Sequence, residues 1–465
     1  MPPGRLKGSK NKQHDQPPRV QPPTNWGVKV RDLVQTRHRF LRHFGSKIPH
    51  IIGECTPYKA FRLLWTDQME QHVLKRTHQQ NQSNGDLSLS ADTLQRFLLA
   101  GLMMCMNVRP DYKMHWSSNS LLVNNDLKSL ISRNAFHSTL NLLHPDPQIL
   151  AQMANLNFRS HWQPLEHVTI DEGLICFKGR YQHRVHIRGK PDATGLKIYG
   201  LADQSGYMYA FDLYKGDKTT IPEIVMGLLG KLPSKNFKVY ANSWYGSEDL
   251  ALLLLQHGYL FTLGCGKNKP TLIFNDYLDK SLSKGQVRYL QHEKHPNLLA
   301  LSYNDRAKCH FFTNLFRPEF TDNRKSQTIP SVVEDYRHYI GSIDRVDRSA
   351  KSACWPHKNS RWTMAFLWYL LGLCVSNARL ILADHNNVSY NLSDFLVDLI
   401  GEWRSELDTK KSAQRRPTHR LEKSTSKARC EVCKQIDLNI SKTPLYCIVC
   451  KIHLHPRCFT DYHKR

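Results

Sequence analysis

Acidic residues are scarce in this sequence, which holds 40 Asp and Glu against 65 Lys and Arg and has a net charge of +25. A positive excess of this size, spread over a folded chain, is typical of proteins that bind nucleic acid. A basic surface could also serve an anionic membrane or an acidic protein. The charge balance therefore favours a polyanionic partner without identifying it.

The sequence also lacks a recognisable secretory leader and an uninterrupted apolar run. Residues 1–23 are polar and rich in proline, unlike a signal peptide. The longest apolar run, 362–382, contains Asn377 and Arg379, so we expect a buried core helix and no membrane partner. Without a secretory signal, the 12 cysteines are expected to be reduced thiols and metal ligands, not a disulfide framework.

The first 25 residues are expected to form a disordered basic tail, because they are poor in apolar residues and rich in Pro, Lys and Gln. Around Arg5 this tail resembles an AT-hook, a motif that lies in the minor groove of A·T-rich DNA. Leu6 stands where that motif has its proline, and Pro3 where it has its first arginine. The segment is either a degenerate AT-hook or a plain basic tail.

Hydrophobic periodicity divides the rest of the chain. Helical spacing predicts a helical region before residue 165, whereas short strands around two helices predict an α/β unit with a mixed sheet. The predicted strands are Val168–Phe177, Leu196–Leu201, Met208–Tyr214, Phe237–Tyr240 and Tyr259–Leu263. The predicted regions are a basic tail 1–25, a first helical part 26–165, an α/β core 166–265, an insertion 266–335, the last core helix 336–352, a second helical part 353–404, a basic linker 405–429 and a cysteine-rich module 430–465.

An acidic pair, Asp171 and Glu172, lies within the first predicted strand, and a run of cations follows it at once. An acid within a basic surface suits a metal-dependent enzyme that acts on phosphodiesters, because the acid holds the metal and the cations hold the polyanion. A solvated strand end is the simpler alternative. The candidate DNA-binding cations, each of which could instead be a solubility charge, are Arg5, Lys178, Arg180, Arg184, Arg188, Arg345 and Arg348.

Cysteine and histidine crowd the C-terminal module. Two Cys-x2-Cys pairs each close a tight chelate, and zinc takes four nitrogen or sulfur donors, so the spacing predicts a zinc module. Eight candidate ligands allow two zinc ions, which a cross-braced module would hold, and the metal would supply much of the folding free energy. Free cysteines in a disordered tail are the alternative, and His453 is the weakest candidate. The eight are Cys430, Cys433, Cys447, Cys450, His453, His455, Cys458 and His463.

Ordered blocks from about residue 50 to the C-terminus resemble the piggyBac transposase family. Each block is short, but their order along most of the chain is specific. The blocks include Met114–Ser117, Ser132–Phe136, Val168–Glu172, Phe177–Arg180, Gly195–Tyr199, Val239–Ser247 and Gly341–Asp347. The C-terminal zinc module is also similar to that of the family.

The resemblance implies an RNase H-like catalytic core that is interrupted by an insertion and flanked by a helical domain for dimerisation and DNA binding. It implies cut-and-paste transposition at TTAA targets, with three aspartates and divalent metal, usually Mg²⁺. Clustered carboxylates suit this chemistry because they hold the two metal ions that clamp the attacking and leaving oxygens. The implied protein is a nuclear homodimer on double-stranded DNA, either transposon-end-like or A·T-rich.

One catalytic position departs from the family. By resemblance, Asp171 is the first acid, Asp344 the third and Asp347 an accessory acid three residues on, but Asn242 stands at the second position. An amide supplies no negative charge, and losing one member of such a unit costs roughly 10³-fold or more in rate.

We therefore expect a transposase-derived DNA-binding protein with impaired strand-transfer chemistry. One alternative is an active transposase that tolerates Asn242. The other is a factor whose zinc module binds chromatin or a protein partner.

Overall fold

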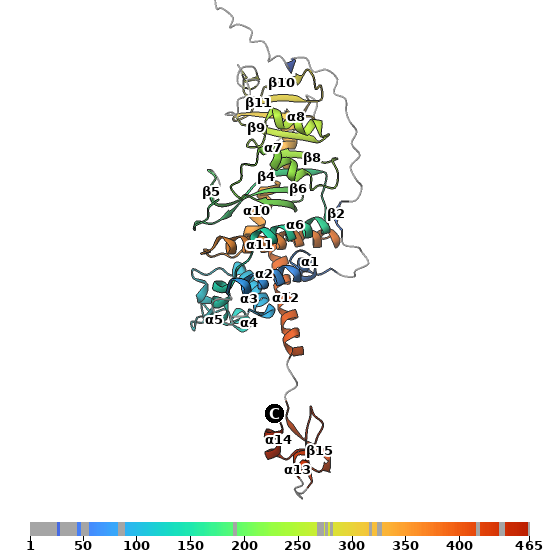
Figure 1. Cartoon of the computed structure of the whole chain (residues 1–465). Helices are drawn as coiled ribbons and strands as arrows, with labels where there is room; N and C mark the ends of the chain where they lie inside the picture. Colours follow the sequence, from blue (N-terminus) through green and yellow to red (C-terminus); the bar gives the residue numbers. More distant parts are fainter. Residues whose placement is uncertain are drawn as a thin grey trace, which may run out of the picture. The chain divides into compact units, whose positions relative to one another are not determined.

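The computed structural model of the chain describes residues 26–27, 44–47, 55–81, 89–188, 193–266, 274, 278–279, 282–315, 319–322, 328–414, 419–436 and 442–463 (Figure 1). It divides into two compact units, Met1–Ile400 and Gly401–Arg465. The predicted basic tail, with Arg5, lies outside the described residues.

A mixed sheet of ten strands is the centre of the first unit, in the order β1-β10-β11-β12-β9-β8-β4-β6-β5, with β7 paired to β6. Strands β4, β8 and β9 run parallel to one another, and the other pairs are antiparallel. The strands are β1 (Trp26–Gly27), β4 (His167–Cys176), β5 (Val185–His186), β6 (Thr194–Asp203), β7 (Met208–Leu213), β8 (Lys238–Ala241), β9 (Leu260–Cys265), β10 (Val287–His292), β11 (Leu299–Asn304) and β12 (Lys308–Thr313). The predicted mixed α/β fold is confirmed.

Helices precede, connect and follow these strands. They are α1 (Pro57–Leu64), α2 (Asp67–Asn81), α3 (Ala91–Met106), η3 (Tyr112–Trp116), α4 (Asn125–Leu130), α5 (Arg133–Leu142), α6 (Pro147–His161), α7 (Ile221–Leu229), α8 (Glu248–Gln256), α9 (Ser331–Tyr339), α10 (Ser342–Ser352), α11 (Trp362–His385) and α12 (Leu392–Gln414). Two short strand pairs complete the first unit: β2 (Gly45–Ser46) with β3 (Trp162–Gln163), and β13 (Phe320–Asp322) with β14 (Thr328–Pro330).

Helix α10 packs on the sheet where two glycines leave room for it. Gly173 on β4 and Gly200 on β6 are the positions concerned. A Cβ on Gly200 would lie 2.8 Å from the Ile343 Cδ1 atom, and a Cβ on Gly173 would lie 3.3 Å from the Asp347 Oδ1 atom. Gly200 is paired with Asp171 in the β4–β6 register, so α10 crosses the sheet beside Asp171.

Two buried asparagines cover the free edge of β7. The Asn155 amide on α6 accepts from the Phe211 N–H and donates to the Phe211 carbonyl, and the Asn377 amide on α11 does the same for Met208. A side-chain amide thus replaces the hydrogen bonds of a further strand, which protects the edge from pairing with another chain.

Helix α11 is the predicted core helix. Within the described residues it is the helix that is long and apolar enough to cross a membrane, but 89% of its most apolar stretch is buried inside the fold. Asn377 is buried and hydrogen-bonded to the sheet, as above, so the polar residue in the apolar run has a structural partner.

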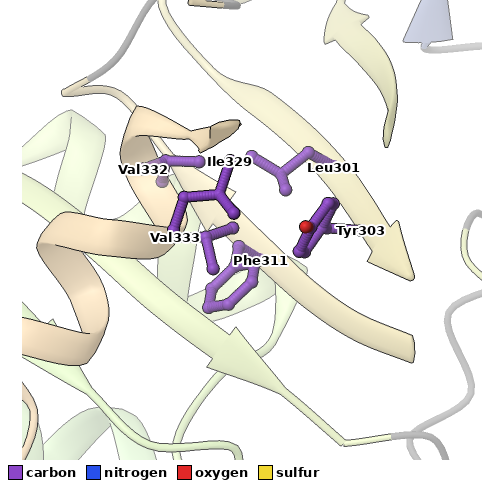
Figure 2. Packing of buried hydrophobic residues seen from close by; sticks show 6 residues of the cluster. All are labelled: Leu301, Tyr303, Phe311, Ile329, Val332 and Val333. Atoms are coloured by element: carbon purple, nitrogen blue, oxygen red, sulfur yellow. The ribbon is translucent and has the colours of Figure 1, made fainter. Parts of the chain in front are cut away.

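Strands within the predicted insertion 266–335 continue the central sheet, because β12 pairs antiparallel with β9. Figure 2 shows how side chains of β11 and β12 pack against Ile329 on β14 and against Val332 and Val333 on α9. This apolar cluster ties the added strands to the segment that leads into α10.

The second unit contains β15 (Leu421–Ala428), α13 (Glu431–Gln435), β16 (Thr443–Cys447) and α14 (Pro456–His463). The predicted linker 405–429 differs from what is observed: residues 405–414 continue α12, and 421–428 form β15. Composition alone suggested a tether, but β15 gains a partner strand, β16, from beyond the first cysteine pair.

His115 in η3 is fully buried, and neither of its ring nitrogens has a hydrogen-bond partner among the described residues. Burial, followed by the nearby charges of Arg109 and His357, lowers the pKa of its imidazole to about 4 from 6.5. Between these values the unfolded state binds a proton that the folded state does not. The stability that neutral His115 contributes is therefore fully present above pH 6.5. It decreases as the pH is lowered from 6.5 towards 4, by about 1.4 kcal/mol per pH unit.

We expect His115→Leu to flatten this dependence, because the variant has no imidazole to protonate on unfolding. Chemical denaturation at pH 7 and at pH 5 measures the free energy of unfolding. The decrease from pH 7 to pH 5 should be about 2 kcal/mol smaller in His115→Leu than in the parent. His137→Gln, which changes an exposed histidine of the same helical region, is the control. An equal loss in parent and His115→Leu would contradict this role of His115.

Candidate functional site

Asp171 and Asn242 are neighbours because of the register of two parallel strands. Ile170 on β4 is paired with Ala241 on β8, so the next residue of each strand reaches the same point. The Asn242 Nδ2 atom donates a hydrogen bond to the Asp171 Oδ1 atom at 2.5 Å. The Glu172 backbone N–H donates to the same oxygen at 2.7 Å.

The orientation of the Asn242 amide is set by both of its neighbours. The Trp244 backbone N–H donates to the Asn242 Oδ1 atom at 2.8 Å, so this atom has to be the carbonyl oxygen. The NH₂ group then faces the Asp171 carboxylate. An aspartate in this geometry would place two carboxylates at hydrogen-bond distance, which is unfavourable unless a cation or proton lies between them.

The two acids of α10 have different surroundings, although they are three residues apart. Asp347 is buried; it accepts a hydrogen bond from the Tyr369 hydroxyl at 2.7 Å and pairs with the Lys351 ammonium at 3.1 Å. Burial and the Asp347 charge raise the pKa of Tyr369, which keeps this donor protonated. Asp344 is exposed. Asp347 is therefore held by Tyr369 and Lys351, and the sequence did not predict these two contacts.

Asp171, Asp344 and Asp347 do not form a close group of three carboxylates in the described part of the chain. Across the described residues, only two groups bring three or more His, Cys, Asp or Glu ligand atoms within 4.8 Å of one another, and both lie in the second unit. Asp171, Asp344 and Asp347 belong to neither group. The arrangement supplies one carboxylate, Asp171, that accepts a hydrogen bond from an uncharged amide, and one, Asp347, that is paired with a lysine.

The candidate DNA-binding cations fall into two sets. Arg184 and Arg345 are used by the fold: Arg184 donates to the carbonyls of Lys178 and Gly179, and Arg345 to the Gln204 carbonyl and the Ser342 hydroxyl. The second set comprises Lys178, Arg180, Arg188 and Arg348. All six side chains are exposed, so each is accessible to a phosphate backbone.

The second unit brings its cysteines and histidines together as two four-residue groups. The first group is Cys430, Cys433, His455 and Cys458, and the second is His419, Cys447, Cys450 and His463. The residues of the two groups alternate along the chain. Each group therefore joins segments that are separated in sequence by residues of the other group. This interleaving is the cross-brace pattern that the spacing suggested.

His453 was predicted as a ligand, and the structure places it outside both groups. Its Nδ1 atom pairs with the Thr443 carbonyl at 3.0 Å. His419 takes the fourth place instead, with its Nδ1 atom 3.3 Å from the sulfur atoms of Cys447 and Cys450. Spacing could not identify it, because the β15–β16 register that pairs Leu421 with Cys447 is what brings His419 near.

Backbone N–H groups favour the thiolate of Cys430, one of the ligands of the first group. Burial raises the pKa of the Cys430 thiol, but N–H groups of Cys433, His455 and Val432 lower it to about 7 overall. A thiolate, not a thiol, is the metal ligand. Each group offers four nitrogen and sulfur donors within reach of a single ion.

Comparisons with known proteins agree with this fold. A family model described as Transposase IS4 matches residues 56–379, well over half of the chain. PiggyBac transposable element-derived protein 2 of Homo sapiens is 21% identical over 503 residues, covering 93% of this chain and 81% of that protein. PiggyBac transposable element-derived protein 3 of Homo sapiens is 20% identical over 466 residues, covering 88% and 76%.

A solved structure has the same fold. The cryo-EM structure of a piggyBac transposase synaptic complex with hairpin DNA aligns with a TM-score of 0.69 at 20% identity, covering 81% of this chain and 85% of that chain.

We expect the full chain to bind two zinc ions, one for each group. His419→Ala should lower the content to about one ion, because the second group loses a ligand, and His453→Ala should leave it at two. Elemental analysis after dialysis against a weak chelator measures the content. Loss of zinc in His453→Ala but not in His419→Ala would contradict the assignment.

We expect Asn242→Asp to destabilise the chain in the absence of divalent metal, because a second charge then faces Asp171. The loss should be about 2 kcal/mol and should be recovered on adding Mg²⁺, whereas the parent should not respond to Mg²⁺. Ser243→Asp, which adds the same charge at the adjacent exposed position, is the matched control. Thermal denaturation with and without Mg²⁺ tests this; stabilisation of the parent by Mg²⁺ would count against it.

Proposed function

Because the chain belongs to the piggyBac transposase family, we propose that it is a transposase-derived DNA-binding protein with impaired strand-transfer chemistry. The observation that carries this proposal is the hydrogen bond from the Asn242 amide to the Asp171 carboxylate. It joins directly two side chains that a catalytic site would hold apart around a metal ion.

The strand order supports an RNase H-like core. Strands β7, β6 and β4 form an antiparallel set, and β8 and β9 continue from β4 in parallel. Asp171 lies on the central strand, position 242 at the end of its parallel neighbour, and Asp344 on the helix that packs against them. We assign the three catalytic positions of the resemblance to these places, and β10–β12 to the insertion.

The catalytic positions do not fit Mg²⁺ as they stand. When bound, Mg²⁺ would stabilise the charge on a reacting phosphate and lower the pKa of a bound water. Here one Asp171 oxygen already accepts two N–H donors, and Asp347 is neutralised by Lys351. We therefore assign no strand-transfer step to this chain.

The two groups of the second unit fit zinc, because each offers four soft donors and zinc is held tetrahedrally by cysteine and histidine in structural sites. We propose that zinc folds this module and that no reaction occurs there, since the four donors of each group would fill the four positions of a bound ion. His419 completes the second site and His453 positions the backbone at Thr443.

Double-stranded DNA is the partner that we propose, with transposon ends or A·T-rich sequence as targets. The net charge of +25 supports it, as do the exposed side chains of Lys178, Arg180, Arg188 and Arg348. The similar solved structure is a complex with hairpin DNA, as its title states. A homodimer and a nuclear location accord with this function and belong to the proposal.

Binding and cleavage assays on one labelled duplex test the proposal. The chain should bind the duplex, with an affinity that falls by roughly 10³-fold between 50 and 200 mM salt. It should leave the strands intact in Mg²⁺ or Mn²⁺. Metal-dependent cleavage by the parent chain would establish the active-transposase alternative, and failure to bind DNA would favour a protein-binding role for the zinc module.

A further inference from the structure

We propose that a cavity outside the candidate catalytic cluster binds an unpaired nucleotide of a DNA end. The cavity has a volume of about 490 Å³ and lies between the loop after β4, the end of β7 and the start of α11. Its lining includes Gln148, Arg180, Tyr181, His183, Lys215 and Trp362. The inference rests on the proposed DNA-binding function and specifies a substrate feature that this function does not require.

Two aromatic rings supply the surface for a base. The Tyr181 and Trp362 ring centroids are 4.5 Å apart, with an interplanar angle of 31°, and both residues are partly exposed. The His183 ring meets Tyr181 edge-on at 5.5 Å. Every base has a π-face that can stack on such rings, and proteins that hold single strands use aromatic side chains in this way.

Two cations supply the surface for a phosphate. Arg180 and Lys215 are exposed, and neither side chain has a hydrogen bond or ion pair among the described residues. An arginine beside aromatic rings suits a nucleotide, because it can pair with a phosphate oxygen or stack on a base. The combination of aromatic and cationic groups in one hollow favours a nucleotide over a purely apolar ligand.

The walls of the cavity are braced. Gly216 has φ of +77°, and a Cβ there would lie 2.0 Å from the His183 Nδ1 atom, so the loop carrying Lys215 packs directly on His183. On the other wall, the Arg184 guanidinium donates to the carbonyls of Lys178 and Gly179 at 2.6 and 2.8 Å. These contacts keep Arg180 and Lys215 on loops that are fixed before any ligand binds.

The aromatic surface of the cavity favours an unpaired nucleotide over a base pair. In a duplex the faces of each base are covered by its neighbours, so only an unpaired base can stack on Tyr181 and Trp362. A second cavity, of about 290 Å³, shares Gln148 and Lys215 with the first and is also lined by Asp217 and Glu223. Its carboxylates would repel a phosphate, so the DNA backbone should leave the site on the Arg180 side.

The test compares a blunt duplex with the same duplex that carries a short single-stranded overhang, using the full zinc-loaded chain. We expect the overhang to raise the affinity about tenfold, the effect of stacking one base. A 2-aminopurine at the first unpaired position should lose fluorescence on binding. Trp362→Ala and Tyr181→Ala should remove the preference and the quenching but keep the affinity for the blunt duplex, whereas Trp362→Phe should retain both.

Matched variants separate this site from general DNA binding. Trp244→Ala changes another exposed aromatic residue that does not line the cavity and should keep the preference. Lys178→Gln should weaken binding to both duplexes equally, whereas Arg180→Gln should weaken binding to the overhang more. Equal affinity of the parent for both duplexes would overturn only the nucleotide site, and binding to neither would overturn the proposed function as well.

Discussion

The hydrogen bond between the Asn242 amide and the Asp171 carboxylate is the constraint on which the interpretation of this chain depends. Parallel pairing of β4 and β8 forces the two side chains together, whatever residues stand there. With two carboxylates, that proximity is repulsive and becomes favourable when a cation bridges them. With one amide, the pair satisfies itself, and the fold no longer needs a metal at this place.

The elements around Asp171 are held in defined contacts. Gly173 and Gly200 allow α10 to approach the sheet beside Asp171, and Asp347 is buried in a defined contact with Tyr369 and Lys351. The C-terminal module is separate in both sequence and chemistry: its two groups offer sulfur and nitrogen atoms, four in each group. An amide in place of a carboxylate at position 242 therefore leaves these two groups unchanged.

Much of this could be predicted from the sequence, because local patterns determine it. The strand predicted at Val168–Phe177 is observed one residue earlier, at His167–Cys176, and the strand predicted at Met208–Tyr214 is observed at Met208–Leu213. The proximity of positions 171 and 242 also followed, but only through family resemblance. What could not be predicted depends on distant pairing: His419 joins a metal group through the β15–β16 register, and Arg345 donates to the Gln204 carbonyl from a segment far along the chain. The spacing of residues along the sequence does not predict such contacts between distant segments.

A crystal structure of the core soaked in Mn²⁺, with anomalous scattering data, tests the central claim most directly. The account predicts no anomalous peak between Asp171 and Asp344, with the Asn242 Nδ2 atom still at hydrogen-bond distance from the Asp171 carboxylate. A manganese peak coordinated by Asp171 together with the Asn242 carbonyl oxygen or Asp344 would contradict it, because the amide would then have turned to serve a metal ion.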